Sequence, residues 1–192
     1  MTLTHKGTTT IETERLVLRR FELTDADAMF NNWANDVEVC NFVNFKPHRT
    51  IDVTKEVIFK WVNSYSNIEI YNWAIVPKEY GKAIGSISIV EAKNNNLACE
   101  IGYAMSKNYW NKGIMTEALK AVMNYLFSEV GYNRIQTRHD TQNPASGRVM
   151  EKSGMKLEGT MRQDKLRKND TFGDRNIWAL LRKEWCETYE TA

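Results

Sequence analysis

The sequence has few cysteines and prolines and no long apolar run. Its 192 residues include three of each, and the cysteines at positions 40, 99 and 186 form neither a close pair nor a metal-ligand spacing. No metal site is therefore predicted. Free thiols are typical of a reducing compartment, which predicts a cytoplasmic protein. No stretch approaches the roughly eighteen consecutive apolar residues of a membrane span, so no membrane is expected as a partner.

The sequence also lacks a large excess of either positive or negative charge. Lysine and arginine total 26 and aspartate and glutamate 24, which gives a formal net charge of +2 without a basic run. Nucleic acid is therefore not expected as a partner. Hydrophobic residues make up 42% of the chain and aromatic residues 11%, enough for the core of one domain. We expect a flexible leader over residues 1–10 and a single domain over residues 11–192.

The periodicity of apolar residues predicts a mixed α/β chain. The strand–helix–strand passage from 97 to 140 predicts a right-handed parallel crossover. The order of elements predicts one mixed sheet of about seven strands with helices on both faces. Strands are expected over 11–21, 69–76, 83–91, 97–105, 134–140, 155–166 and 172–182, helices over 24–33, 51–65, 115–126 and 143–154, and an irregular aromatic segment over 36–47.

Residues 97–116 join a strand to the N-terminus of a helix through one tight turn. Glu100 lies on a face of the strand whose other side chains are small, which leaves room for a ligand. In the turn, Gly113 precedes the apolar helical stripe that starts at Met115. Free backbone amides and the helix dipole make such a turn an anion site, and Lys112 adds a charge. The stretch therefore predicts a phosphate-binding turn beside a strand carboxylate.

Five short motifs occur in an order and spacing that match a known family. They are ETERLVLR at 12–19, EIGY at 100–103, YWNKGIMTEA at 109–118, NPAS at 143–146 and KSGM at 152–155. They span nearly the whole chain. On these motifs the chain resembles the GCN5-related N-acetyltransferases (GNAT), in the branch of ribosomal-protein N-terminal acetyltransferases related to the RimJ and RimL enzymes. The resemblance implies a mostly antiparallel, twisted sheet that is splayed between its two central strands.

The resemblance implies acetyl-CoA as co-substrate and a primary amine as acceptor. The pyrophosphate of CoA is expected on the backbone amides of 111–116, and the pantetheine arm along the strand edge at 103–105, where a bulge splays the strands. Two positions depart from the family's pattern, because Trp110 replaces a Gln or Arg and Met115 a small residue. Backbone amides bind the phosphates, so neither side-chain change removes the site. The expected cofactor-binding residues are Tyr103, Ala104, Met105, Asn111, Lys112, Gly113, Ile114, Met115, Thr116 and Asn143.

Two side chains are expected to take part in the chemistry. Glu100 is predicted to be the general base that removes the amine proton, directly or through water, and a structural ion pair with a nearby Lys or Arg is the alternative. By the resemblance, Ser146 donates a hydrogen bond to the departing sulfur, whereas a serine at this position otherwise caps its helix. Capping also explains Asn143 before Pro144.

Three functions stay open from the sequence. The first is acetyl transfer to the N-terminal α-amino group of a protein or peptide, by direct attack in a ternary complex. The second is the same chemistry on a small amine such as a polyamine, amino acid or antibiotic, and the third is a non-catalytic acyl-CoA-binding domain. Trp33, Phe42, Phe45 and Trp73 are candidates for either the acceptor pocket or the core. The acceptor, and whether the chain forms a homodimer, are left open.

Overall fold

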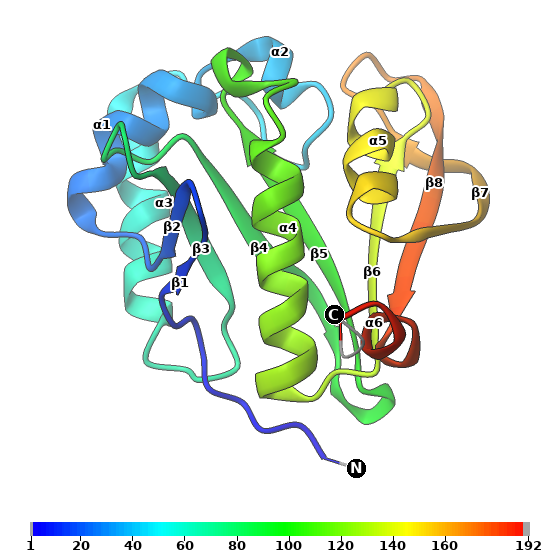
Figure 1. The fold of residues 1–192 in the computed structure, drawn as a ribbon. Coiled ribbons are helices and arrows are strands. Elements are labelled where there is room, and N and C mark those ends of the chain that lie inside the picture. Colours follow the sequence, from blue (N-terminus) through cyan, green and yellow to red (C-terminus); the bar gives the residue numbers. More distant parts are fainter. Residues whose placement is uncertain (1, 190–192) are drawn as a thin grey trace.

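Eight strands form one mixed sheet within residues 2–189, the part of the chain that the computed structural model describes (Figure 1). Their order is β1-β2-β3-β4-β5-β6-β8-β7, and every neighbouring pair is antiparallel except β5 and β6. The predicted mixed, mostly antiparallel sheet is confirmed, with one strand more than expected. The strands are β1 (Ile11–Glu12), β2 (Leu16–Arg19), β3 (Asn72–Pro77), β4 (Gly85–Lys93), β5 (Ala98–Met105), β6 (Arg134–Asp140), β7 (Lys156–Leu166) and β8 (Phe172–Leu181).

Helices cover both faces of the sheet. Figure 1 shows α4 and α5 side by side on one face, and α3 lies on the opposite face with α1 packed against it. One π-helical turn follows α1 (Phe30–Ala34) and another follows α4 (Leu126–Val130). The helices are α1 (Ala26–Met29), α2 (Val37–Cys40), α3 (Ile51–Ser64), α4 (Ile114–Tyr125), α5 (Pro144–Lys152) and α6 (Arg182–Tyr189), with short 3-10 turns at Leu23–Asp25, Asn94–Asn96 and Lys107–Tyr109.

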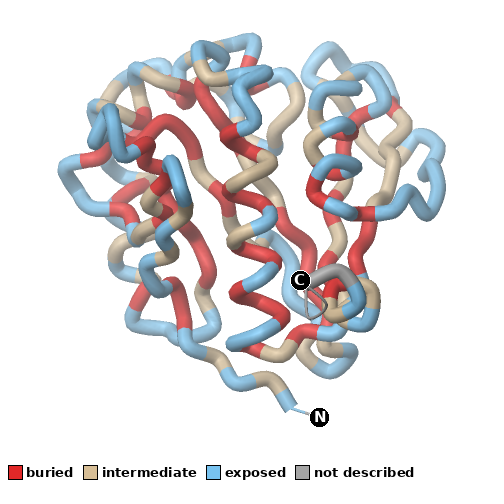
Figure 2. Tube along the Cα trace, viewed as in Figure 1, coloured by how far each residue is buried: buried red, intermediate tan, exposed pale blue. Residues whose placement is uncertain are grey.

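The core consists of two apolar clusters, one on each face of the sheet. The larger cluster lies beneath α4 and includes Cys99, Ile101 and Met105 of β5. The smaller cluster joins α1 and α3 to the other face and includes Ala104. Alternate residues of β5 therefore face opposite layers, as its sequence pattern predicted. Figure 2 shows the buried central strands and the mostly exposed β7 at the sheet edge.

The sheet is splayed between its two central strands, as the resemblance implied. β5 pairs with β4 as far as Met105, but it pairs with β6 only where residues 98–100 face residues 134–136. Beyond Glu100, the edge of β5 that faces β6 has no strand partner within residues 2–189. The expected bulge lies elsewhere, since the register shift is in β4 between Ile89 and Glu91 and not at 103–105.

Three segments differ from the sequence expectation. The strand predicted over 11–21 is a hairpin of β1 and β2, because the backbone turns at residues 13–15. The irregular segment 36–47 begins with α2, which forms because the Asp36 carboxylate caps it by accepting from the amides of Glu38 and Val39. The helix α6 was not predicted. These differences leave the central strand–turn–helix passage unchanged.

The residues before β1 contact the sheet and α4 along their length. Thr8 donates to the carbonyl of Ile70 at 3.0 Å and accepts from the amide of Asn72 at 2.9 Å. The Trp73 indole donates to the Thr9 carbonyl at 2.7 Å, and Tyr125 of α4 donates to the Gly7 carbonyl at 2.9 Å. These contacts lie within the segment that the sequence predicted to be a flexible leader.

Candidate active site

A cavity of about 640 Å³ lies where β5 and β6 diverge. Its walls come from the free edge of β5, the turn before α4, the end of β6 and the start of α5. Segment 39–45 and two cations of the β7–β8 hairpin complete the lining. All the predicted site residues except Lys112 line this cavity: Glu100, Tyr103, Ala104, Met105, Asn111, Gly113, Ile114, Met115, Thr116, Asn143 and Ser146.

The turn before α4 is shaped by two residues with a left-handed backbone. Asn111 has φ 59°, and Gly113, the N-cap of α4, has φ 75°. Glycine adopts this conformation without steric cost, whereas a β-branched side chain is strained there. The amides of the first turn of α4 have no acceptor within the helix, so with the helix dipole they favour an anion. The turn therefore has the geometry of an anion-binding site.

A carboxylate on α4 fastens this turn to the β1–β2 hairpin. Glu117 accepts hydrogen bonds from Thr13 Oγ1 at 2.6 Å and from Arg15 Nε at 2.6 Å. Arg15 also donates to the backbone carbonyl of Lys112 at 3.0 Å. Burial alone would raise the pKa of Glu117, but these hydrogen bonds and the charge of Arg15 lower it below its ordinary value. The hairpin thus holds the turn in place.

Lys112 and Trp110 have roles that the sequence did not show. The Lys112 ammonium lies over the Tyr109 ring, 5.3 Å from its centroid, and Lys112 is absent from the cavity lining. The positive charge that was expected at the anion site therefore lies over the ring of Tyr109. The Trp110 indole donates to the Met105 carbonyl at 3.0 Å. This bond ties the turn to the end of β5, which gives the departure at Trp110 a structural purpose.

Glu100 lies in the cavity wall as one half of a buried ion pair. Glu100 is 7% exposed. Its carboxylate accepts hydrogen bonds from Arg138 Nε at 2.9 Å and from Arg138 Nη2 at 2.7 Å. Gln136 Nε2 donates to the same carboxylate at 3.0 Å. Burial alone would lower the pKa of Arg138, but Glu100 raises it above its ordinary value. A carboxylate has about four acceptor positions, so one remains for a water or an amine.

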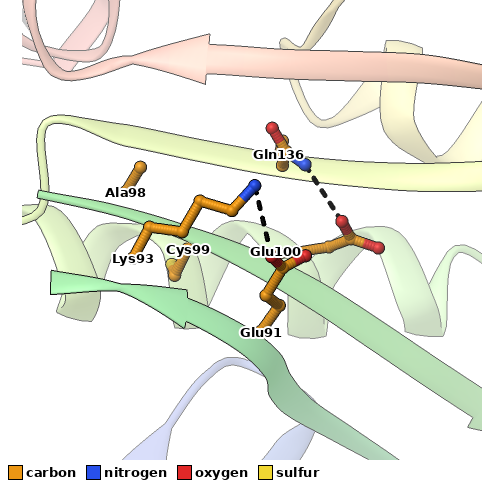
Figure 3. A pocket seen from close by; sticks show the side chains of 6 residues that line it. All are labelled: Glu91, Lys93, Ala98, Cys99, Glu100 and Gln136. Atoms are coloured by element: carbon orange, nitrogen blue, oxygen red, sulfur yellow. Dashed lines mark hydrogen bonds and ion pairs between the residues drawn. The ribbon is translucent and has the colours of Figure 1, made fainter. Parts of the chain in front are cut away.

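A small cleft lies beside Glu100 on the paired part of β5 and β6. Figure 3 shows Glu91, Lys93, Glu100 and Gln136 around it, with the Gln136 amide bonded to the Glu100 carboxylate. Its volume of about 10 Å³ is at the lower limit for one water molecule. Ala98 and Cys99 complete its lining, and Glu100 is the residue that lines both this cleft and the large cavity.

The start of α5 faces the free edge of β5. The Asn143 side chain caps α5 by accepting from the amide of Ser146 at 3.3 Å, as capping predicted. Ser146 Oγ shares a hydrogen bond of 2.8 Å with the Tyr103 hydroxyl of β5. Burial raises the pKa of Tyr103, so this hydroxyl stays protonated at neutral pH. A polar bridge therefore spans the splay between β5 and α5, inside the cavity.

The sequence model described as "Acetyltransferase (GNAT) domain" matches residues 15–156, well over half of the chain. The chain belongs to the GNAT family. N-acetyltransferase p20 of Bacillus licheniformis, itself uncharacterized, is 29% identical over 177 residues, which cover 92% of this chain and 98% of that protein. The GNAT acetyltransferase from Bacillus anthracis has a crystal structure with 27% identity and a TM-score of 0.80, covering 91% of this chain and 99% of that one.

The ribosomal-protein-serine acetyltransferase of Escherichia coli is 30% identical over 98 residues, which cover 51% of this chain and 54% of that protein. This GNAT chain is an acetyl-CoA-dependent N-acetyltransferase that acts on an amine acceptor. The alternative of a non-catalytic acyl-CoA-binding domain is thereby set aside. Within residues 2–189, no helix is long and apolar enough to cross a membrane. In the same residues, no three His, Cys, Asp or Glu side chains gather to hold a metal ion.

The acceptor side of this GNAT cavity combines aromatic and charged residues. Phe42 and Phe45 line it, whereas Trp33 and Trp73 are fully buried in the two core clusters. The sequence could not separate these four aromatics, because apolar residues in the core and in a pocket look alike. Five cations also line the cavity and were not predicted: Arg138, Lys165, Arg175, and Arg148 and Lys152 of α5. One signal for Arg138 was available, since it follows Gln136 by two residues and so shares the strand face toward Glu100.

Proposed function

We propose that this acetyltransferase acetylates the N-terminal α-amino group of a protein or peptide, by direct attack in a ternary complex with acetyl-CoA. One observation carries the proposal: a single cavity joins the turn at 111–116, the free edge of β5 and Glu100. Donor and acceptor meet there without an enzyme nucleophile. Cys99 next to Glu100 lies in the core under α4, outside the lining, and burial raises the pKa of its thiol.

The donor is held mainly by the backbone. The amides of 111–116 take the pyrophosphate, and Asn143 contacts CoA from the start of α5. The pantetheine arm lies along 103–105, where the edge of β5 has backbone groups that β6 does not pair. Such an arm completes the strand edge much as an added strand does. This arrangement directs the acetyl group into the splay.

Glu100 removes the amine proton, directly or through a water bound at its remaining acceptor position in the large cavity. The neutral nitrogen attacks the acetyl carbonyl carbon, the C–S bond breaks, and CoA leaves as a thiolate. Backbone amides near Tyr103 and Met105 stabilise the oxyanion that forms during attack. The Arg138 pair keeps the Glu100 carboxylate fixed in the cavity wall. This geometry supports general-base catalysis at Glu100.

Ser146 donates a hydrogen bond to the departing sulfur. Ser146 Oγ lies at the splay and is hydrogen-bonded to the Tyr103 hydroxyl at 2.8 Å. Because Tyr103 is protonated, it can donate to Ser146 Oγ while Ser146 donates its own hydrogen to the sulfur. A hydroxyl that is itself hydrogen-bonded is also fixed in orientation. The pair therefore suits the protonation of a thiolate.

The protein acceptor is supported by one relative named as a ribosomal-protein-serine acetyltransferase. A cytoplasmic location belongs to the same proposal, and three free cysteines agree with a reducing compartment. A homodimer stays a prediction. The structure itself favours an extended acceptor, because the cavity continues past Glu100 to segment 39–45 and the β7–β8 hairpin.

The proposal is tested by a panel of acceptors under a CoA-release assay. The panel holds peptides with free N-termini, the same peptides with formylated N-termini and an internal lysine, and small amines. We expect turnover with the free N-termini alone, with mass spectrometry locating the acetyl group on the α-amine. Turnover confined to polyamines, amino acids or antibiotics would overturn the protein acceptor and leave the acetyltransferase activity in place.

A further inference from the structure

Lys165 of β7 reaches into the cavity from the hairpin at the edge of the sheet. It lines the cavity, and its Nζ donates to the backbone carbonyl of Phe42 at 3.1 Å. Lys168 in the same hairpin donates to the carbonyls of Cys40 and Phe45, yet it is not a lining residue. Two lysines therefore attach the hairpin to segment 39–45, and only Lys165 faces the cavity.

The other cations at this end of the cavity have carboxylate partners. Arg138 pairs with Glu100, and Arg175 pairs with Asp164, whose Oδ2 lies 2.6 Å from Arg175 Nε. Lys165 has no carboxylate within 4.0 Å among residues 2–189. Asp140, whose charge raises the pKa of Lys165, is held by two hydrogen bonds from Arg167. The acceptor end thus carries a positive charge that the protein leaves uncompensated.

This charge is half-buried, which gives a negative ligand an advantage. Burial is the main influence that lowers the pKa of Lys165; the charges of Arg175, Lys168 and Arg167 lower it further, and Asp140 opposes them. A desolvated ammonium with one carbonyl acceptor is less stable than one paired with a carboxylate. A polyamine would add like charge to the same place. The acceptor end therefore selects against cationic acceptors.

Acidic side chains elsewhere do not change this balance. Asp36 and Glu38 are the acids next to segment 39–45. Both bind Lys107, at 3.1 Å and 3.2 Å, and neither lines the cavity. Glu100 is the acid at the reacting centre and is already paired. No acid among the described lining residues is left to receive a second ammonium group.

We propose that Lys165 binds a carboxylate of the acceptor, so that the preferred substrate carries an acidic group close to the amine that is acetylated. The inference rests on the proposed function and narrows its substrate class. The carboxylate is expected on the side chain of an acidic residue near the peptide N-terminus. A preference found only with the free amino acid would overturn the protein acceptor and leave the role of Lys165 in place. Aromatic neighbours Phe42 and Phe45 pack against the carbon chain that links the two groups.

Matched acceptors test this with the full-length enzyme and saturating acetyl-CoA. Three peptides share one sequence except for Glu, Gln or Lys at the second position, and an amino acid is compared with its carboxamide. We expect kcat/KM to be about tenfold higher for the acidic member, as one charge-assisted hydrogen bond gives. The series in which the preference occurs identifies the source of the carboxylate. Equal kcat/KM across both series overturns the proposal.

Variants separate recognition from a structural role of Lys165. Lys165→Met should abolish the preference for the acidic member and leave the KM for acetyl-CoA unchanged, and Lys165→Glu should invert the preference toward the lysine peptide. Lys168→Met is the matched control, because it removes a similar tie to segment 39–45 and should keep the preference. If Lys165→Met lowers kcat/KM equally for every acceptor, Lys165 only anchors the segment and the proposal is wrong.

Calorimetry keeps this test independent of turnover. The CoA-saturated enzyme is titrated with the acidic and neutral acceptors, and tighter binding of the acidic one in wild type but not in Lys165→Met supports the proposal. Equal binding of the two contradicts it. Absence of turnover on all acceptors would count against the proposed function, while this binding difference would still decide the role of Lys165.

Discussion

The two ends of the cavity are held in different ways. At the donor end, the turn at 111–116 is tied to β5 by Trp110 and to the β1–β2 hairpin through Arg15 and Glu117. At the acceptor end, segment 39–45 meets the β7–β8 hairpin mainly through lysine side chains that donate to backbone carbonyls. The backbone of the donor end is therefore fixed by hydrogen bonds from neighbouring elements. The acceptor end is held by the terminal ammonium groups of flexible lysine side chains.

This difference matches what each end has to bind. Acetyl-CoA is the same for every reaction, and backbone amides recognise its phosphates whatever side chains surround them. The acceptor varies among acetyltransferases, and contacts made by side chains change with single substitutions. We infer that substitutions at the donor end alter the affinity for acetyl-CoA, whereas those at the acceptor end alter the choice of amine.

The largest effect is expected at Glu100, where the two ends meet. Glu100→Gln keeps the shape and the bond from Gln136 but removes the base, so kcat should fall roughly 10²–10⁴-fold. The Kd for acetyl-CoA should stay within about twofold of wild type, because the donor is held elsewhere. Steady-state kinetics and calorimetry measure the two quantities. Near-wild-type turnover would leave Glu100 with only its structural ion pair to Arg138.

A smaller effect is expected on stability at Asp140, which fixes the β7–β8 hairpin to β6. Asp140→Asn removes the negative charge and one of the two oxygens that accept from Arg167, and we expect the free energy of unfolding to fall by about 1–3 kcal/mol at pH 7. Thermal or urea unfolding measures the change. KM for acetyl-CoA should be nearly unaffected, which tests the independence of the two ends.

The pH dependence of this pair has a defined sign. Burial alone would raise the pKa of Asp140, but Arg167 and the Gln142 amide lower it below the ordinary value of 3.8. The folded state therefore holds its proton less tightly than the unfolded state. Stability from the pair is complete above pH 3.8 and is lost as the pH falls through the lower folded-state pKa. The gap between wild type and Asp140→Asn should close in strong acid, and a constant gap would contradict the ion pair.

An effect of similar size to that at Asp140 is expected at Gly113. Gly113→Val places a β-branched residue at φ 75°, and strain of roughly 1–3 kcal/mol should weaken acetyl-CoA binding about tenfold to a hundredfold. Gly81→Val is the matched control, because Gly81 also has a positive φ (69°) but lies in the β3–β4 turn with nothing near a new Cβ. If both variants bind acetyl-CoA like wild type, the turn does not hold the phosphates.

How much the sequence could predict follows the same division. The donor end lies within one continuous stretch, 97–116, so local periodicity and a glycine before a helix were enough to place it. The ion pair of Glu100 with Arg138 depended on the register of β5 and β6, which only the folded sheet fixes. Lys165 meets Phe42 across 123 residues of chain, and no local pattern records such a contact.

Two further elements show why local patterns were insufficient. The hairpin at residues 13–15 was read as continuous strand, because its turn is stabilised by Glu117 from a distant helix. Lys112 was expected to add charge to the phosphate site, yet its ammonium lies over Tyr109. The hairpin depends on a tertiary contact with α4. The contact of Lys112 with Tyr109 is local, since the two residues are three apart, and the sequence left open only how their side chains meet.

A crystal structure of the enzyme with acetyl-CoA tests the central claim most directly. We expect the pyrophosphate within hydrogen-bond distance of the amides of 111–116, with the sulfur near Ser146 and the acetyl carbon facing Glu100. A pyrophosphate bound away from the α4 turn, or a thioester directed away from the splay of β5 and β6, would contradict it.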